Sequence, residues 1–75
     1  MVNEELKKTW SAYIRDAKKK GYRKETIKTL GMLALSKDAA SHFGSSLLAF
    51  EHLLSLVKKY NEKETIRLFI NELKI

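Results

Sequence analysis

The stretch that decides the fold is Ser46–Tyr60, SLLAFEHLLSLVKKY. Apolar residues surround most of this segment when it is drawn as a helix. The remaining narrow polar stripe consists of Glu51, His52, Ser55, Lys58 and Lys59. A helix that is apolar on most sides must be covered by other elements. The sequence therefore predicts a central helix over residues 46–60, with the rest of the chain packed around it.

Two helices are expected before this central segment. The chain has no proline and three glycines, and no segment alternates with the period of a strand. The first helix starts at the candidate N-cap Asn3 and ends in lysines 18–20 before Gly21. The second opens at Lys24 or Glu25 and runs to about residue 35. Gly31 lies inside it, which favours close approach by another helix over a kink.

The helical boundaries after residue 35 depend on two sequence signals. A short helix is expected over residues 38–43, followed by a break at Gly44. If Gly44 does not break the chain, residues 37–60 form one long helix instead. Asn61, with Glu64 three positions later, is typical of a capping box and opens the last helix.

These elements predict an all-α fold, a compact four-helix bundle made of two helical hairpins. A fifth short helix near residues 38–43 is left open. The whole chain, residues 1–75, is expected to form one domain. A chain of this length has a marginal core. It contains no cysteine, so neither a disulfide nor a thiolate metal site can stabilise it.

A ten-residue sequence recurs at an offset of 39 positions. Residues 19–28, KKGYRKETIK, match residues 58–67, KKYNEKETIR, at six positions. In both copies a helix ends in paired lysines and the next helix opens with Lys-Glu-Thr-Ile. One interpretation is a pair of duplicated hairpins in a pseudo-twofold arrangement. The other is that helix junctions draw on few residue types, and the sequence leaves both open.

The net charge of +6 lies in the first half of the sequence. Residues 1–37 hold ten Lys/Arg and four Asp/Glu, whereas residues 38–75 hold five of each. Such asymmetry favours a protein that meets a polyanion with one end. The candidate phosphate-contacting residues are Arg15, Lys18, Lys19, Lys20, Arg23, Lys24 and Lys28. The alternative is that these residues form a solvated polar face.

Nucleic-acid binding by this cluster is expected to favour the backbone over base sequence. A helix-turn-helix frame can be laid on residues 36–55, but its second helix would present Leu47 and Leu48 where base-reading polar residues are needed. The first hypothesis is therefore a small DNA-binding regulatory protein that contacts phosphates through the junction of the first two helices.

The competing hypothesis is a protein-interaction adaptor or inhibitor that binds an acidic partner, such as a phage or plasmid regulator or an immunity-type protein. Leu68 and Ile75 fall on a second apolar side of the last helix. Together with Met32 they are the candidate partner or dimer contacts, and a homodimer is expected. The basic cluster would then steer association with the acidic partner.

Catalysis is not supported by the sequence. There is no cysteine nucleophile, the two histidines lie ten residues apart, and no glycine-rich phosphate loop is present. We therefore expect no enzyme activity, metal, cofactor or small-molecule substrate. The longest uncharged run, residues 39–50, is shorter than a membrane span, and no signal peptide is visible. A cytoplasmic protein without membrane contact is expected.

Overall fold

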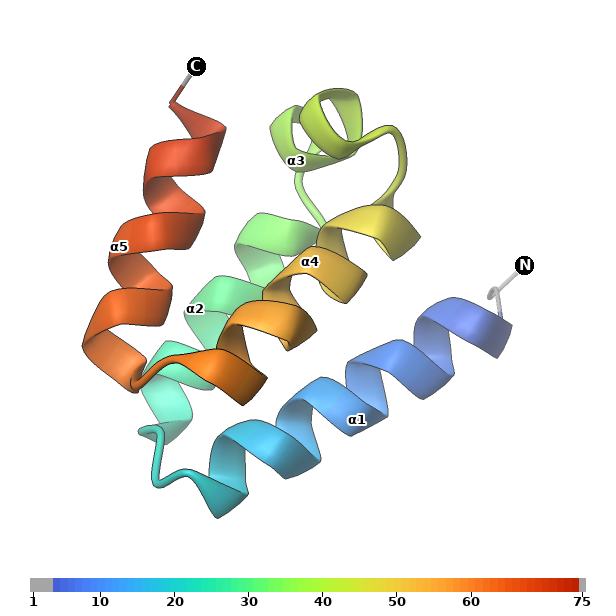
Figure 1. The fold of residues 1–75 in the computed structure, drawn as a ribbon. Helices are drawn as coiled ribbons and strands as arrows, with labels where there is room; N and C mark the ends of the chain where they lie inside the picture. The colour runs from blue at the N-terminus through green and yellow to red at the C-terminus, as the bar shows by residue number, and fades with distance from the viewer. Residues whose placement is uncertain (1–3, 75) are drawn as a thin grey trace.

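The computed structural model describes residues 4–74, which form five α-helices (Figure 1). The helices are α1 (Glu4–Lys19), α2 (Lys24–Ala34), α3 (Lys37–Phe43), α4 (Ser46–Lys59) and α5 (Glu62–Leu73). The all-α bundle expected from the sequence is confirmed, with the short fifth helix present. The expected cap Asn3 lies outside the described residues.

Helix α4 is the centre of the bundle, and each of the other four helices contacts it. Its fully or nearly fully buried residues are Ala49, Phe50, Leu53, Leu56 and Val57. Helix α1 makes the most extensive contact and lies along α4, with their C-terminal ends at the same end of the molecule (Figure 1). The rings of Trp10 and Tyr13 lie 5.6 Å and 6.0 Å from that of Phe50. The apolar sequence of residues 46–60 therefore takes the central place that it predicts.

Gly44 breaks the chain between α3 and α4, so the single long helix over residues 37–60 is wrong. Gly44 adopts a left-handed conformation with φ of 101°. Ser45 caps the next helix, because its side chain accepts a hydrogen bond from the Leu48 amide at 3.1 Å. A left-handed residue followed by an N-cap ends one helix and starts another. The sequence carries both signals at adjacent positions.

Tyr13 ties α1 to α2. Its hydroxyl donates a hydrogen bond of 2.7 Å to the Ile27 carbonyl, and burial raises the pKa of this phenol. The same ring lies over Gly31, where an added Cβ would stand 3.8 Å from Tyr13 Cε2. Helix α2 continues through Gly31 without a break, so the kink is absent, but the helices do not approach closely enough there to require glycine. The distance is an ordinary contact, so alanine would also fit.

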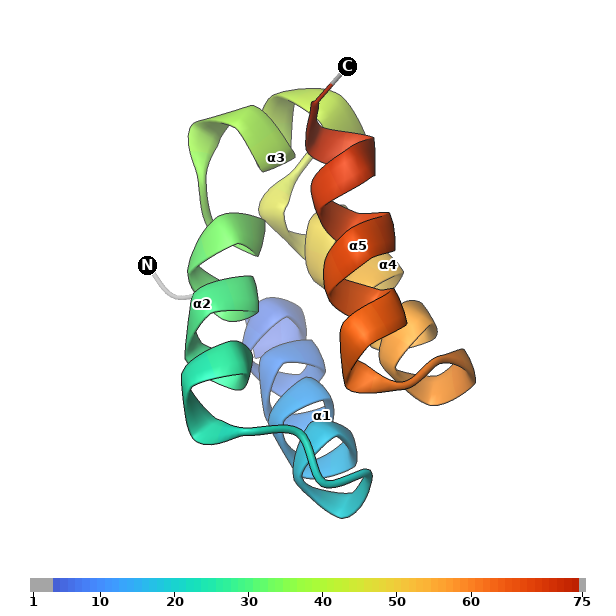
Figure 2. The same cartoon turned by 90° about the vertical axis from the view of Figure 1, so that its left-hand side faces the viewer.

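The two hairpins, α1–α2 and α4–α5, are joined by α3, which lies across one end of the bundle (Figure 2). Phe43 of α3 stacks on Phe69 of α5, with ring centroids 5.9 Å apart, and contacts the His52 ring of α4 at 4.9 Å in a tilted arrangement. His42 lies 3.0 Å from Glu72. Within residues 4–74, no helix has the length and apolar character needed to cross a bilayer.

Candidate nucleic-acid interface

The two turns that carry the repeated sequence lie against each other at the end of the bundle opposite α3 (Figure 1). The Lys20 ammonium donates to the Tyr60 carbonyl at 3.0 Å and to the Lys58 carbonyl at 3.4 Å. A lysine near free carbonyls at a helix C-terminus is favourable because it complements the helix dipole. Lys20, from the end of α1, therefore caps the end of α4.

Tyr22 fills the contact between the turns. This residue is 6% exposed, and its hydroxyl donates a hydrogen bond of 2.7 Å to the Tyr60 carbonyl. The same oxygen lies 2.7 Å from Thr65 Oγ1 of α5. Burial raises the pKa of the Tyr22 phenol, and the nearby Glu62 carboxylate adds to the shift. Tyr22 is thus a structural residue and not an exposed nucleic-acid contact.

Arg23 and Glu62 complete the contact. The Arg23 guanidinium lies 3.0 Å from the Glu62 carboxylate, which also accepts hydrogen bonds from the Arg23 amide and the Thr26 hydroxyl. The Thr26 bond and then the Arg23 bond lower the pKa of Glu62 below its usual value. No side chain of α2 itself caps this helix, so Glu62 supplies the anion at its N-terminus.

These interactions separate the seven predicted phosphate-contacting residues into those that have a partner within the protein and those that have none. Lys20 and Arg23 bind the second turn, and Arg15 lies 3.9 Å from Asp16. The other four of the seven, Lys18, Lys19, Lys24 and Lys28, are exposed and form no hydrogen bond or ion pair within residues 4–74. The structure therefore leaves four of the seven with free ammonium groups.

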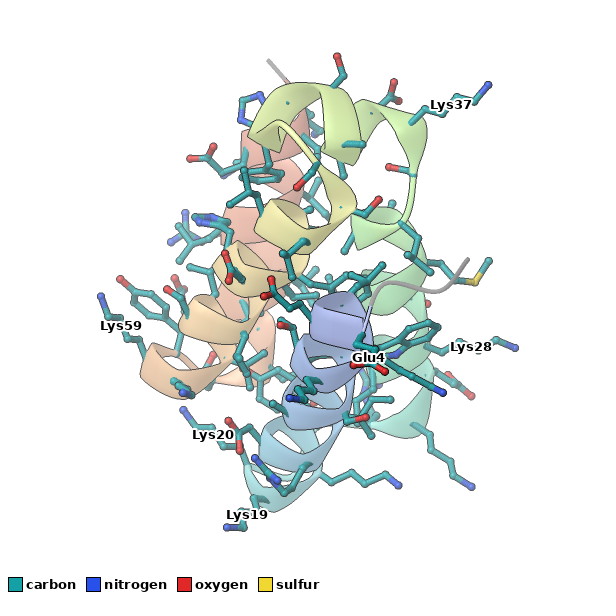
Figure 3. All side chains as sticks on the ribbon, turned by 90° about the vertical axis from the view of Figure 1, so that its right-hand side faces the viewer. Glu4, Lys19, Lys20, Lys28, Lys37 and Lys59 are labelled. Carbon is teal, nitrogen blue, oxygen red and sulfur yellow. The ribbon has the colours of Figure 1, made fainter. Side chains whose placement is uncertain are left out.

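Lysines from the second half of the sequence join this surface, which the charge count by halves did not predict. Lys58 and Lys59 end α4 beside the end of α1, and Lys63 is in the first turn of α5. We call this surface the basic end: Lys18, Lys19, Lys20, Arg23, Lys24, Lys58, Lys59 and Lys63. In Figure 3, Lys19 and Lys20 lie at this end and Lys59 projects from the side nearer the middle of the molecule, whereas Lys37 lies at the opposite end. The repeated Lys-Lys pair was the sequence signal that could have identified Lys58 and Lys59.

Helix α4 is poorly placed to read bases. Helices α1, α2, α3 and α5 all pack against it, so it cannot insert into a groove as an isolated element. Apart from the terminal Lys58 and Lys59, its exposed side chains are Leu48, Glu51 and Ser55. None of these is the arginine, asparagine or glutamine that makes a bidentate base contact. The exposed charge of the basic end, by contrast, suits phosphates.

A second surface feature lies between α1 and α2. Trp10, Ile14, Ile27, Gly31, Met32 and Leu35 line an apolar groove of about 380 Å³. Lys18, Lys24 and Lys28 line the same groove. Three of the most exposed large apolar side chains are here: Met32 is 64% exposed, Leu35 41% and Trp10 39%.

The predicted partner contacts are not brought together. Met32 lies on the α1–α2 groove, whereas Leu68 of α5 is half-buried and packs against the core. Ile75 lies outside the described residues. The homodimer through these residues stays a prediction.

The described residues offer no metal centre. Among residues 4–74, no three His, Cys, Asp or Glu side chains converge in a way that could hold an ion. His42 contacts Glu72, a pairing across 30 positions that spacing along the sequence does not reveal. Comparison with models of known protein families, with curated proteins and with solved structures found no match.

Proposed function

We propose that this protein binds nucleic acid without catalysing a reaction, as a small DNA-binding regulatory protein that contacts the phosphate backbone with its basic end. One observation carries the proposal: the lysine-rich ends of α1 and α4 lie side by side, so the repeated Lys-Lys pairs form one surface. Lys18, Lys19, Lys58 and Lys59 are all exposed there.

Electrostatics supports a polyanion as the ligand. Duplex DNA presents one negative charge per about 1.7 Å of axis, and each lysine that neutralises a phosphate releases a counterion. The described molecule extends over 30 × 29 × 19 Å, so a duplex laid across one end meets several phosphates within reach of these flexible side chains. Because the candidate contacts are lysines aimed at the backbone and α4 presents no base-reading side chain, the proposed contact has little sequence preference.

The test is a titration of a labelled random-sequence duplex at about 50 mM and about 200 mM salt, followed by fluorescence anisotropy. A variant with Lys18, Lys19, Lys58 and Lys59 changed to glutamine should bind more weakly on every sequence. The slope of log affinity against log salt should flatten by about 0.9 for each lost phosphate contact.

The matched control changes four exposed lysines away from the basic end, Lys7, Lys8, Lys37 and Lys74, to glutamine. It removes the same charge but should keep most of the affinity and the salt slope. An equal loss in both variants would show that net charge alone drives binding. The absence of binding by the parent protein at low salt would overturn the proposal.

A further inference from the structure

We infer that the groove between α1 and α2 is a docking site for an acidic amphipathic helix of a partner protein. The groove shares Lys18 and Lys24 with the basic end, but its apolar part goes beyond the proposed nucleic-acid function, because a phosphate backbone has no apolar face with which to fill it. The inference rests on the shape of the groove, its apolar lining and the distribution of charge along it.

The groove is concave and lies between two helices, which is the geometry that accepts a third helix. Between Trp10 and Lys18, α1 rises by about 12 Å, so the groove accommodates two to three turns of a docked helix. Its volume of about 380 Å³ is comparable to the pockets that hold drug-sized ligands. Ile14 and Ile27 are partly or fully buried and line it with apolar surface.

The lining changes character along the groove. The α1–α2 hairpin is antiparallel, so Trp10 of α1 lies toward Met32 in the last turn of α2 and Leu35 at its C-cap. Lys18, near the end of α1, lies toward Lys24 and Lys28 at the start of α2. The groove is therefore apolar at one end and basic at the other.

This polarity specifies the occupant. Apolar side chains at positions i, i+3 and i+7 of a docked helix would cover Trp10, Met32 and Leu35. Carboxylates nearer one end of that helix would pair with Lys18, Lys24 and Lys28, whose ammonium groups make no hydrogen bond or ion pair within the described chain. Charge complementarity favours an acidic helix and speeds its association.

A membrane surface is the less suitable occupant. Interfacial helices insert side chains that project from a convex apolar face, with basic residues along the opposite polar face. Here the apolar atoms line a concavity, and three lysines share that concavity with them.

The chain provides a built-in probe, because Trp10 is its one tryptophan. The ligand for the test is a synthetic peptide of about 14 residues, with leucines spaced for one helical face and glutamates grouped toward one end. We expect saturable binding, a shift of Trp10 emission to shorter wavelength as the indole loses water, and weakening by salt. A peptide of the same composition in scrambled order should bind far less.

Matched variants distinguish binding in the groove from nonspecific hydrophobic binding elsewhere on the surface. Met32→Gln with Leu35→Gln should weaken peptide binding by about tenfold or more, since the docked helix would cover a polar amide in place of each apolar side chain. Leu48→Gln with Tyr60→Gln also removes two exposed apolar side chains, but outside the groove, and should leave the affinity within about twofold. Lys24→Gln with Lys28→Gln should flatten the salt dependence.

Three results would overturn the inference. They are equal binding of the scrambled peptide, equal losses in the two apolar double variants, and a Trp10 shift with phosphatidylglycerol vesicles but not with the peptide. The double variant Lys58→Gln with Lys59→Gln tests the nucleic-acid proposal separately from the groove. That variant should weaken duplex binding and leave peptide binding unchanged, because neither residue lines the groove.

Discussion

Two turns carry the repeated sequence, one between α1 and α2 and the other between α4 and α5. Their ten-residue sequences match at six positions, but where the turns meet the first provides hydrogen-bond donors and the second provides acceptors. The shared positions, Lys-Lys before each turn and Lys-Glu-Thr-Ile after it, end and begin the helices in both copies. The contact between the turns is asymmetric and uses positions that differ as well as shared ones such as Lys20, Thr26 and Thr65. The first turn contributes donors from Lys20, Tyr22 and Arg23, whereas the second contributes the Tyr60 carbonyl and the Glu62 carboxylate.

Arg23 and Glu62 occupy equivalent positions of the repeat and pair with each other. Two equivalent residues meet when the units that carry them are related by an approximate twofold axis. Identical charged residues there would repel, so the difference between arginine and glutamate makes the contact favourable. Helix α2 packs against α4, but the equivalent pair α5 and α1 makes no comparable contact, so the symmetry does not extend through both hairpins. Both interpretations of the repeat stay open.

The largest expected effect comes from Tyr22, compared with its equivalent Asn61. Tyr22→Ala removes a buried ring and two hydroxyl contacts, and should reduce the free energy of unfolding by about 3 kcal/mol. Asn61→Ala removes only the cap of α5 and should cost about 1 kcal/mol. Urea denaturation followed by circular dichroism measures both. Similar losses in the two variants would contradict the asymmetry of the turns.

The next effect separates Gly21 from its equivalent Tyr60. Gly21 has φ of 81°, whereas Tyr60 has φ of −125°. Gly21→Ala has free space around the new Cβ but forces a left-handed residue, and should cost about 1 kcal/mol. Tyr60→Ala, at an exposed side chain in extended backbone, should cost about 0.5 kcal/mol or less. Thermal melts of the two variants provide the comparison, and a more stable Gly21→Ala protein would refute the strain argument.

A smaller effect is expected from exchanging the charges of the Arg23–Glu62 pair. Arg23→Glu places two carboxylates together, and Glu62→Arg also removes the acceptor for the Thr26 hydroxyl. Both single variants should melt at a lower temperature than the parent. The double exchange should regain part of the loss, because it restores an opposite-charge pair. Losses that simply add in the double variant would show that the two side chains do not interact.

The smallest effect is a pH dependence localised at Glu62. Hydrogen bonds from Thr26 and Arg23 hold the folded-state pKa below the unfolded value. The unfolded state therefore takes up the proton first as the pH falls, so this contribution is complete above the unfolded pKa and disappears as the pH falls through the folded one. The urea midpoint should decrease between about pH 5 and about pH 3, less so in Glu62→Gln. An identical decrease in the variant would assign the pH dependence to other groups.

The sequence predicted the helices well because their signals are local. Ser36 and Gly44 bound α3, and Asn61 caps α5 by accepting from the Glu64 amide at 2.9 Å. The expected capping box is only half formed, since the Glu64 carboxylate binds Arg67 instead. The start of α2 carried no local cap to find. The carboxylate at the N-terminus of α2 is that of Glu62, which lies 39 positions after Arg23 in the sequence.

The candidate site was only partly predictable. The basic cluster of the first two helices was visible as a charge excess, but a count along the sequence assigns Lys58 and Lys59 to a neutral half. A count of charges also could not show that Lys20 and Arg23 bind groups of the turn between α4 and α5. The apolar groove was equally hidden, because Trp10 and Met32 face it from separate helices. Charge and exposure belong to surfaces, and surfaces combine residues that are distant along the chain.

By itself, then, the sequence determined the helices, the Asn61 cap of α5 and the central place of residues 46–60, because helix period, capping residues and breaks act over a few positions. The tertiary structure alone decided how the repeated turns meet, which lysines remain free and where apolar side chains stay uncovered. Those outcomes depend on contacts across 36 to 43 positions, such as Thr26–Glu62 and Tyr22–Thr65. Local sequence signals carry no information about contacts of that range.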